Sequence, residues 1–156
     1  MRRTSPVLIL LTALLLFASC ATEPLKQAGM QGESTLGLVR DLASAYERKD
    51  IEAFMEKVSP AYPDRDGFRR SLEGVFSSYQ TIGMKVQYTR LLISVPAKGD
   101  IRMTYTWEGE WQSSGGKIIK DGARSTLLLD KGTFKLLGIE GKNPYLPAQS
   151  PVPARQ

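Results

Sequence analysis

The spacing of apolar residues changes once along the chain, and this change constrains the fold more than any other feature. From Leu38 to Tyr79 the apolar residues recur every three or four positions, as on one face of a helix. From Met84 to Ile139 they mostly alternate with polar residues, as on one face of a strand. Helices followed by a run of strands predict an α+β domain in which an antiparallel sheet packs against the helices.

Three helices are predicted before this change. The first follows a capping Ser34 or Thr35, the second follows Asp50 and must stop before Pro60, and the third follows Asp66. Their apolar faces consist of Leu38, Leu42, Ala45, Tyr46, Ile51, Phe54, Met55, Val58, Phe68, Leu72, Val75, Phe76 and Tyr79. Such one-sided helices need a partner surface, which the strands supply.

Four strands are predicted after it, over residues 84–95, 101–112, 117–129 and 133–140. The alternation reverses its parity near 89–92, which predicts a β-bulge or bend there. Gly109 and the pair Asp121-Gly122 interrupt the pattern and predict two further irregularities. A bent four-stranded sheet would be concave on the side that faces the helices.

The N-terminus is typical of a secretory signal peptide. Two arginines at positions 2 and 3 precede an apolar run over 7–18, which is too short to span a membrane. The segment ending Ala18-Ser19-Cys20 resembles a bacterial lipoprotein signal. The resemblance implies cleavage of residues 1–19, acyl chains on Cys20 and, with Ala21 following, an outer-membrane protein that faces the periplasm. The alternative is an ordinary cleaved signal followed by an incidental cysteine.

The two ends of the mature chain have a different composition from the domain. Residues 20–33 combine the lipidated cysteine with Pro, Gly and Gln, which predicts a flexible tether to the membrane. Residues 142–156 contain four prolines and predict a disordered tail, or alternatively a polyproline II ligand. The domain itself is therefore expected over residues 34–141.

Composition excludes several kinds of site. The chain has no histidine and one cysteine, which removes imidazole catalysis, an internal disulfide and Cys/His metal clusters. Downstream of Asp64-Arg65-Asp66-Gly67 no glutamate falls at the spacing that a calcium loop requires, so we expect no metal and no cofactor. Loss of Arg2 and Arg3 with the signal lowers the net charge from +5 to +3. The basic residues are scattered, so we expect no nucleic-acid partner.

Two segments resemble nuclear transport factor two-like domains. One is Ala43-Ser44-Ala45-Tyr46-Glu47-Arg48-Lys49-Asp50-Ile51-Glu52-Ala53-Phe54, and the other is the closing hairpin of 123–129 and 134–140. The resemblance covers residues 34–141 and implies a curved sheet wrapped around helices as a cone with an interior pocket. It also implies a choice among several functions, since the family contains isomerases, dehydratases, cyclases and members that only bind. The His–Asp pair of the dehydratases is excluded because the chain lacks histidine. A short hairpin that many members place before the long helix is not evident between Val58 and Gly67.

The aromatic residues of the predicted cone are candidates for a ligand pocket, although such residues also serve simply as core. The candidate lining consists of Tyr46, Phe76, Tyr79, Tyr88, Met103, Tyr105 and Trp107. Glu108 and Glu110 have the opposite strand parity and should face solvent, so we identify no catalytic residue. We therefore expect a membrane-anchored, non-catalytic envelope lipoprotein that binds a protein or a small apolar ligand. The alternatives are an isomerase or cyclase that uses tyrosine and a buried carboxylate, and a carrier of hydrophobic molecules.

Overall fold

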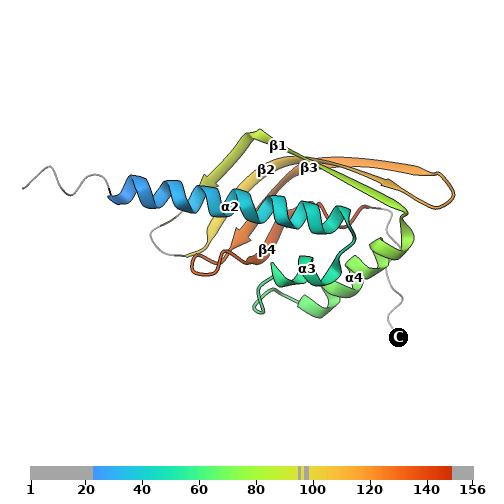
Figure 1. The fold of residues 1–156 in the computed structure, drawn as a ribbon, viewed down its shortest axis with the longest axis horizontal. Helices are drawn as coiled ribbons and strands as arrows, with labels where there is room; N and C mark the ends of the chain where they lie inside the picture. Colours follow the sequence, from blue (N-terminus) through green and yellow to red (C-terminus); the bar gives the residue numbers. More distant parts are fainter. Residues whose placement is uncertain (1–22, 95, 97–98, 149–156) are drawn as a thin grey trace, which may run out of the picture. The chain divides into compact units, whose positions relative to one another are not determined.

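The computed structural model describes residues 23–94, 96 and 99–148 (Figure 1). The predicted signal peptide and Cys20 lie outside the described residues. The compact domain begins at Ser34. We predicted an irregular tether over 20–33, but residues 23–33 are helical, as part of α2 (Glu23–Glu47). Pro24 is compatible with this because a helix tolerates proline in its first turn.

Helices α3 (Ile51–Glu56) and α4 (Arg65–Ser78) lie next to each other in the domain (Figure 1). Asp50 caps α3 as predicted, and its carboxylate accepts a hydrogen bond from the Ala53 amide at 3.0 Å. The cap of α4 is Asp64 and not the predicted Asp66, which lies in the first turn. No helix in the described part of the chain is long and apolar enough to cross a bilayer.

The four predicted strands are confirmed and form one antiparallel sheet in the order β1-β2-β3-β4 (Figure 1). Their bounds are β1 Thr81–Ser94, β2 Ile101–Gln112, β3 Ile118–Leu129 and β4 Leu136–Gly141. The pairing of β1 with β2 shifts between Gln87 and Leu92, so the predicted bulge is also confirmed. This irregularity bends the edge strand and contributes to the curvature of the sheet.

The irregularities predicted at Gly109 and at Asp121-Gly122 are wrong, because β2 and β3 pair without a break over their whole length. Gly109 has a different role. A Cβ atom on Gly109 would lie 2.2 Å from the six-membered ring of Trp111, so the indole packs where a side chain would stand. The glycine therefore serves side-chain packing and not a backbone distortion.

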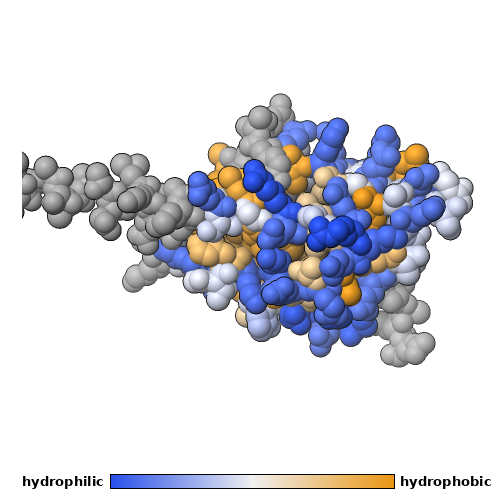
Figure 2. Space-filling model, viewed as in Figure 1, coloured by the Kyte–Doolittle hydropathy of each residue, from blue (hydrophilic) through white to orange (hydrophobic). Residues whose placement is uncertain are grey.

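One face of the sheet and the helices enclose the hydrophobic core. Burial alternates along β2, with the odd-numbered residues buried from Ile101 to Trp111. Trp107 and Trp111 are both fully buried, and their rings meet edge to face. On the face seen in Figure 2 hydrophilic side chains predominate and apolar ones appear in separate spots. The interior of the cone is thus filled by large apolar side chains.

The predicted disordered tail is wrong for residues 142–148. Tyr145 belongs to the core cluster and is 1% exposed, and Pro144 and Pro147 are buried beside it. Prolines carry no backbone N–H group, so a segment without regular structure can be buried here with few donors left to satisfy. We call residues 142–148 the strap; the rest of the predicted tail, 149–156, lies outside the described residues.

Candidate functional site

The predicted pocket residues lie in the interior of the domain. Phe76 is partly buried there, and the side chain of Tyr88 lies outside the described residues. The others are buried in the core cluster: Tyr46, Tyr79, Met103, Tyr105 and Trp107. Tyr46 contacts the rings of Phe54, Phe76 and Tyr145, with centroid distances from 5.2 to 6.2 Å. These side chains pack against one another and against the strap.

The polar atoms of this interior form two chains of hydrogen bonds, and each chain ends on a backbone carbonyl of the strap. The Trp111 indole donates to the Tyr46 hydroxyl at 2.8 Å, and that hydroxyl donates to the Tyr145 carbonyl at 2.8 Å. The Trp107 indole donates to the Ser125 hydroxyl at 2.8 Å, and this hydroxyl donates to the Lys142 carbonyl at 2.5 Å. Burial raises the pKa of Tyr46 above its usual range, so the hydroxyl keeps its proton.

No acidic side chain among the described residues is fully buried in the interior, although Asp121 has the core-facing parity of β3, opposite Gly109. The buried polar residues there are Thr35, Ser59 and Ser125. Glu108 and Glu110 are exposed, as their strand parity predicted. Asp121 is 16% exposed and forms an ion pair with Lys142 at 2.5 Å. The Lys142 ammonium holds the pKa of Asp121 below its usual range, and so this carboxylate stays ionised.

The described residues also contain no group of three or more His, Cys, Asp or Glu side chains placed to hold a metal ion. In the segment 64–67, which superficially resembles a calcium loop, the Asp64 carboxylate accepts from the Gly67 amide at 3.1 Å. This contact is the N-cap of α4, so Asp64 has a local structural role.

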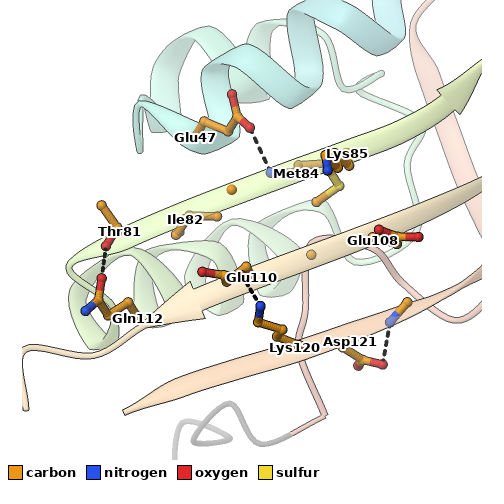
Figure 3. A pocket seen from close by; sticks show the side chains of 13 residues that line it. Glu47, Thr81, Ile82, Met84, Lys85, Glu108, Glu110, Gln112, Lys120 and Asp121 are labelled. Carbon is orange, nitrogen blue, oxygen red and sulfur yellow. Dashed lines mark hydrogen bonds and ion pairs between the residues drawn. The ribbon is translucent and has the colours of Figure 1, made fainter. Parts of the chain in front are cut away.

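A groove with a volume of about 920 Å³ crosses the outer face of the sheet (Figure 3). Strands β1, β2 and β3 form its floor, and Glu47 from the end of α2 stands at the edge of β1. The groove is lined by Glu47, Thr81, Ile82, Gly83, Met84, Lys85, Glu108, Gly109, Glu110, Gln112, Lys120, Asp121 and Gly122. A hollow of this size on an exposed face has room for a segment of a bound partner.

Two glycines hollow this face. Gly83 lies opposite Glu110 across β1 and β2, and Gly122 lies opposite Glu108 across β2 and β3. A strand side chain stands roughly perpendicular to the sheet, so a residue without one leaves a depression between taller neighbours. A Cβ atom added to Gly83 would meet nothing within 4 Å, which shows that this depression is open.

The groove carries more carboxylates than ammonium groups. Lys120 is paired with Glu110 at 2.9 Å. Glu108 accepts a hydrogen bond from the Gln87 amide at 2.9 Å, and Glu47 accepts one from the Met84 backbone amide at 2.7 Å. In the described part of the chain neither Glu108 nor Glu47 forms an ion pair. The groove therefore offers two carboxylates outside any ion pair, with Lys85 opposite Glu108 across β1 and β2.

Sequence reasoning did not find this groove. Strand parity placed Glu108 and Glu110 on the outer face, and we predicted no site there. The available signal was the pair of glycines, Gly83 and Gly122, at outward positions among charged residues. Recognising it requires the strand register, which brings the two glycines beside the same stretch of β2.

Comparison by sequence finds no matching family model and no matching curated protein. Solved structures do match the fold. A proposed aromatic ring hydroxylase from Novosphingobium aromaticivorans has a TM-score of 0.60 at 14% identity, covering 69% of this chain and 86% of its own. A proposed scytalone dehydratase from the same species has a TM-score of 0.61 at 10% identity, and the match covers 73% of this chain and 84% of the dehydratase chain.

An NTF2-like protein of unknown function from Exiguobacterium has a TM-score of 0.50 at 15% identity, covering 65% of this chain and 93% of its own. The chain thus has the nuclear transport factor two-like fold, with helices N-terminal to an antiparallel sheet. Proteins with this fold differ in activity, so the fold alone does not assign one.

Proposed function

We propose that this chain is a lipid-anchored protein of the bacterial outer membrane that faces the periplasm. Its domain binds a segment of a partner protein in the outer groove without catalysis. The observation that carries the proposal is the contrast between the two faces of the sheet. The inner face is filled by the chain's own aromatic side chains, whereas the outer face has an open groove of about 920 Å³.

Chemistry of the kind named for the structural neighbours is not supported by these residues. The names of two neighbours include a hydroxylase and a dehydratase. General acid–base work near neutral pH is most often done by a carboxylate or an imidazole within reach of the substrate. The chain has no histidine, the fully buried polar groups of the described interior are neutral hydroxyls and indoles, and the nearest carboxylate, Asp121, is held in an ion pair by Lys142. The isomerase or cyclase alternative is therefore less well supported than binding.

The charges of the groove indicate the chemistry of the partner. Glu108 and Glu47 form no ion pair in the described residues, and they lie on opposite sides of β1. A lysine or arginine on the partner would pair with either carboxylate, which favours a basic segment. A segment in extended conformation would fit a floor made of the strands β1, β2 and β3.

Filling the groove tests this directly. Gly83→Leu places a side chain in open space on the groove floor and should leave the fold intact. A photo-crosslinking residue at Gln112, in the chain expressed in its own host, should trap one discrete partner, and Gly83→Leu should abolish that adduct. The matched control is Gly138→Leu, on the same sheet outside the groove. An unchanged adduct in Gly83→Leu, or no adduct at Gln112, would refute the groove.

The anchor is tested separately. Metabolic labelling with an alkyne fatty acid should label the wild-type chain, and Cys20→Ser should remove the label and release the protein from the membrane fraction. Labelling that persists in Cys20→Ser would exclude this anchor. The two tests are independent, because a groove can bind a partner whether or not the chain is acylated.

A further inference from the structure

The last described residue of the domain, Ala148, lies beside the groove. Ala148 is exposed, and its backbone amide donates a hydrogen bond to the Asp121 carboxylate. Lys142 forms its ion pair with the same carboxylate, so both ends of the strap are fastened to β3. Asp121 also lines the groove. Residues 149–156 therefore continue from a point at one side of the groove.

This point has a short path to the outer face of the sheet. Strand β4 pairs with β3 only from Ser125 to Leu129. In the described residues the half of β3 that carries Asp121 is thus an edge of the sheet, with no strand beside it. A segment that starts at Ala148 can pass over this edge onto the groove floor without crossing another strand.

The segment 149–156 is long enough to cross the floor. Figure 3 shows Asp121 on β3 at one side of the floor and Glu47 beyond β1 at the other. Neighbouring strands lie about 4.8 Å apart, so β3 and β1 are separated by roughly 10 Å. Pro151 and Pro153 favour an extended polyproline II chain, which advances about 3.1 Å per residue. The segment then reaches roughly 25 Å, enough to pass beyond β1.

The charge of this segment complements the groove. Arg155 is its only charged residue. In the described part of the chain Glu47 forms no ion pair, and one of its oxygens accepts from the Met84 amide. A carboxylate has about four acceptor positions, so Glu47 can also accept from a guanidinium. Arg155 lies roughly 20 Å beyond Ala148 along an extended chain, which suits Glu47 at the far edge and not the nearer Glu108.

We propose that residues 149–156 bind in the outer groove of their own chain and occupy it when no partner is bound. Val152 enters the depression at Gly83, where an added Cβ atom would meet nothing within 4 Å, and Arg155 pairs with Glu47. This inference rests on the proposed function, because it makes the partner's basic segment a competitor of the chain's own. The apparent affinity for the partner is then lowered by the fraction of molecules whose groove is open.

A small diazirine amino acid in place of Val152, in the full chain, tests the contact. Irradiation of the purified protein at low concentration, followed by peptide mass spectrometry, should give an intramolecular crosslink to residues 81–85 or 108–112. Gly83→Leu should reduce its yield at least fivefold, whereas Gly138→Leu, on the same sheet outside the groove, should leave it unchanged. Crosslinks to other regions, or crosslinks that join two copies of the chain, would overturn the proposal.

Reversal of the charge at Arg155 tests the ion pair. Arg155→Glu should lower the yield of the intramolecular crosslink about fivefold, because an exposed ion pair changes an equilibrium by up to roughly that factor. Arg155→Lys should retain most of the yield, and Glu47→Lys combined with Arg155→Glu should restore it. The matched control is Arg70→Glu, the same change at an exposed position of α4 outside the groove. Equal yields in Arg155→Glu and Arg70→Glu would overturn the proposal.

The partner adduct at Gln112 separates this inference from the proposed function. Arg155→Glu should raise the yield of that adduct, because it frees the groove for the partner. An adduct that is unchanged in Arg155→Glu, together with no intramolecular crosslink, would refute occupancy by residues 149–156 and leave the groove proposal intact. An intramolecular crosslink without any partner adduct would support the occupancy and refute partner binding.

Discussion

Substitution of Tyr145 by alanine tests whether the strap is part of the folded domain. The ring is almost fully buried and contacts two aromatic side chains. Truncation of a buried aromatic residue to alanine costs about 3–5 kcal/mol, through lost burial and the cavity left behind. The Tyr46 hydrogen bond is to the backbone and stays available, so it adds nothing to this estimate. A loss of this size corresponds to a fall in melting temperature of roughly 10–20 °C.

Denaturation in urea, monitored by the fluorescence of the two buried tryptophans, measures this loss. Leu146→Ala is the control within the strap, because Leu146 is partly buried and should cost only about 1–2 kcal/mol. The reasoning is refuted if Tyr145→Ala loses less than about 1 kcal/mol, the result that a disordered tail would give.

Three further predictions concern the interior. Gly109→Ala should lower the free energy of unfolding by about 2 kcal/mol, because the new methyl group would overlap the fixed Trp111 ring. Gly83→Ala has open space, so its free energy of unfolding should stay within about 0.5 kcal/mol of the wild type. Similar melting curves for the two variants would contradict this. Tyr46→Phe should cost about 1–3 kcal/mol by leaving the Trp111 N–H and the Tyr145 carbonyl unpaired, as urea titration would show. Because burial raises the pKa of Tyr46, its contribution to stability is full below about pH 10 and is lost as the pH rises further. Tyr46→Phe should therefore not show this loss of stability above about pH 10. An equal loss in both proteins would show that the ionisation of Tyr46 is not its cause.

The regular elements could be predicted because their signals are local. The apolar period predicts α3, α4 and the strands, and the capping aspartate at position 50 stands where α3 begins. The parity of β2 correctly separates buried Tyr105 and Trp107 from exposed Glu108 and Glu110. A reversed parity near Leu92 likewise indicates the bulge without any tertiary information.

The parts that could not be predicted depend on contacts distant in sequence. Prolines around Tyr145 indicate a tail, and only the socket formed by Tyr46 and Phe54 shows why that segment is ordered. Gly109 has the local signature of a bulge, but its cause is the indole two residues later. The groove depends on the register that places Gly83 and Gly122 on either side of β2.

The central claim is that the chain's own large side chains fill the interior of the cone in the part of the chain that the structure describes. Hydrogen exchange of the indole N–H groups of Trp107 and Trp111, measured by NMR on the full chain, tests it most directly. We predict two indole signals that exchange far more slowly than free indole, because each N–H is buried and bonded to a hydroxyl. Rapid exchange of both signals would show that water reaches the interior, and would contradict the account.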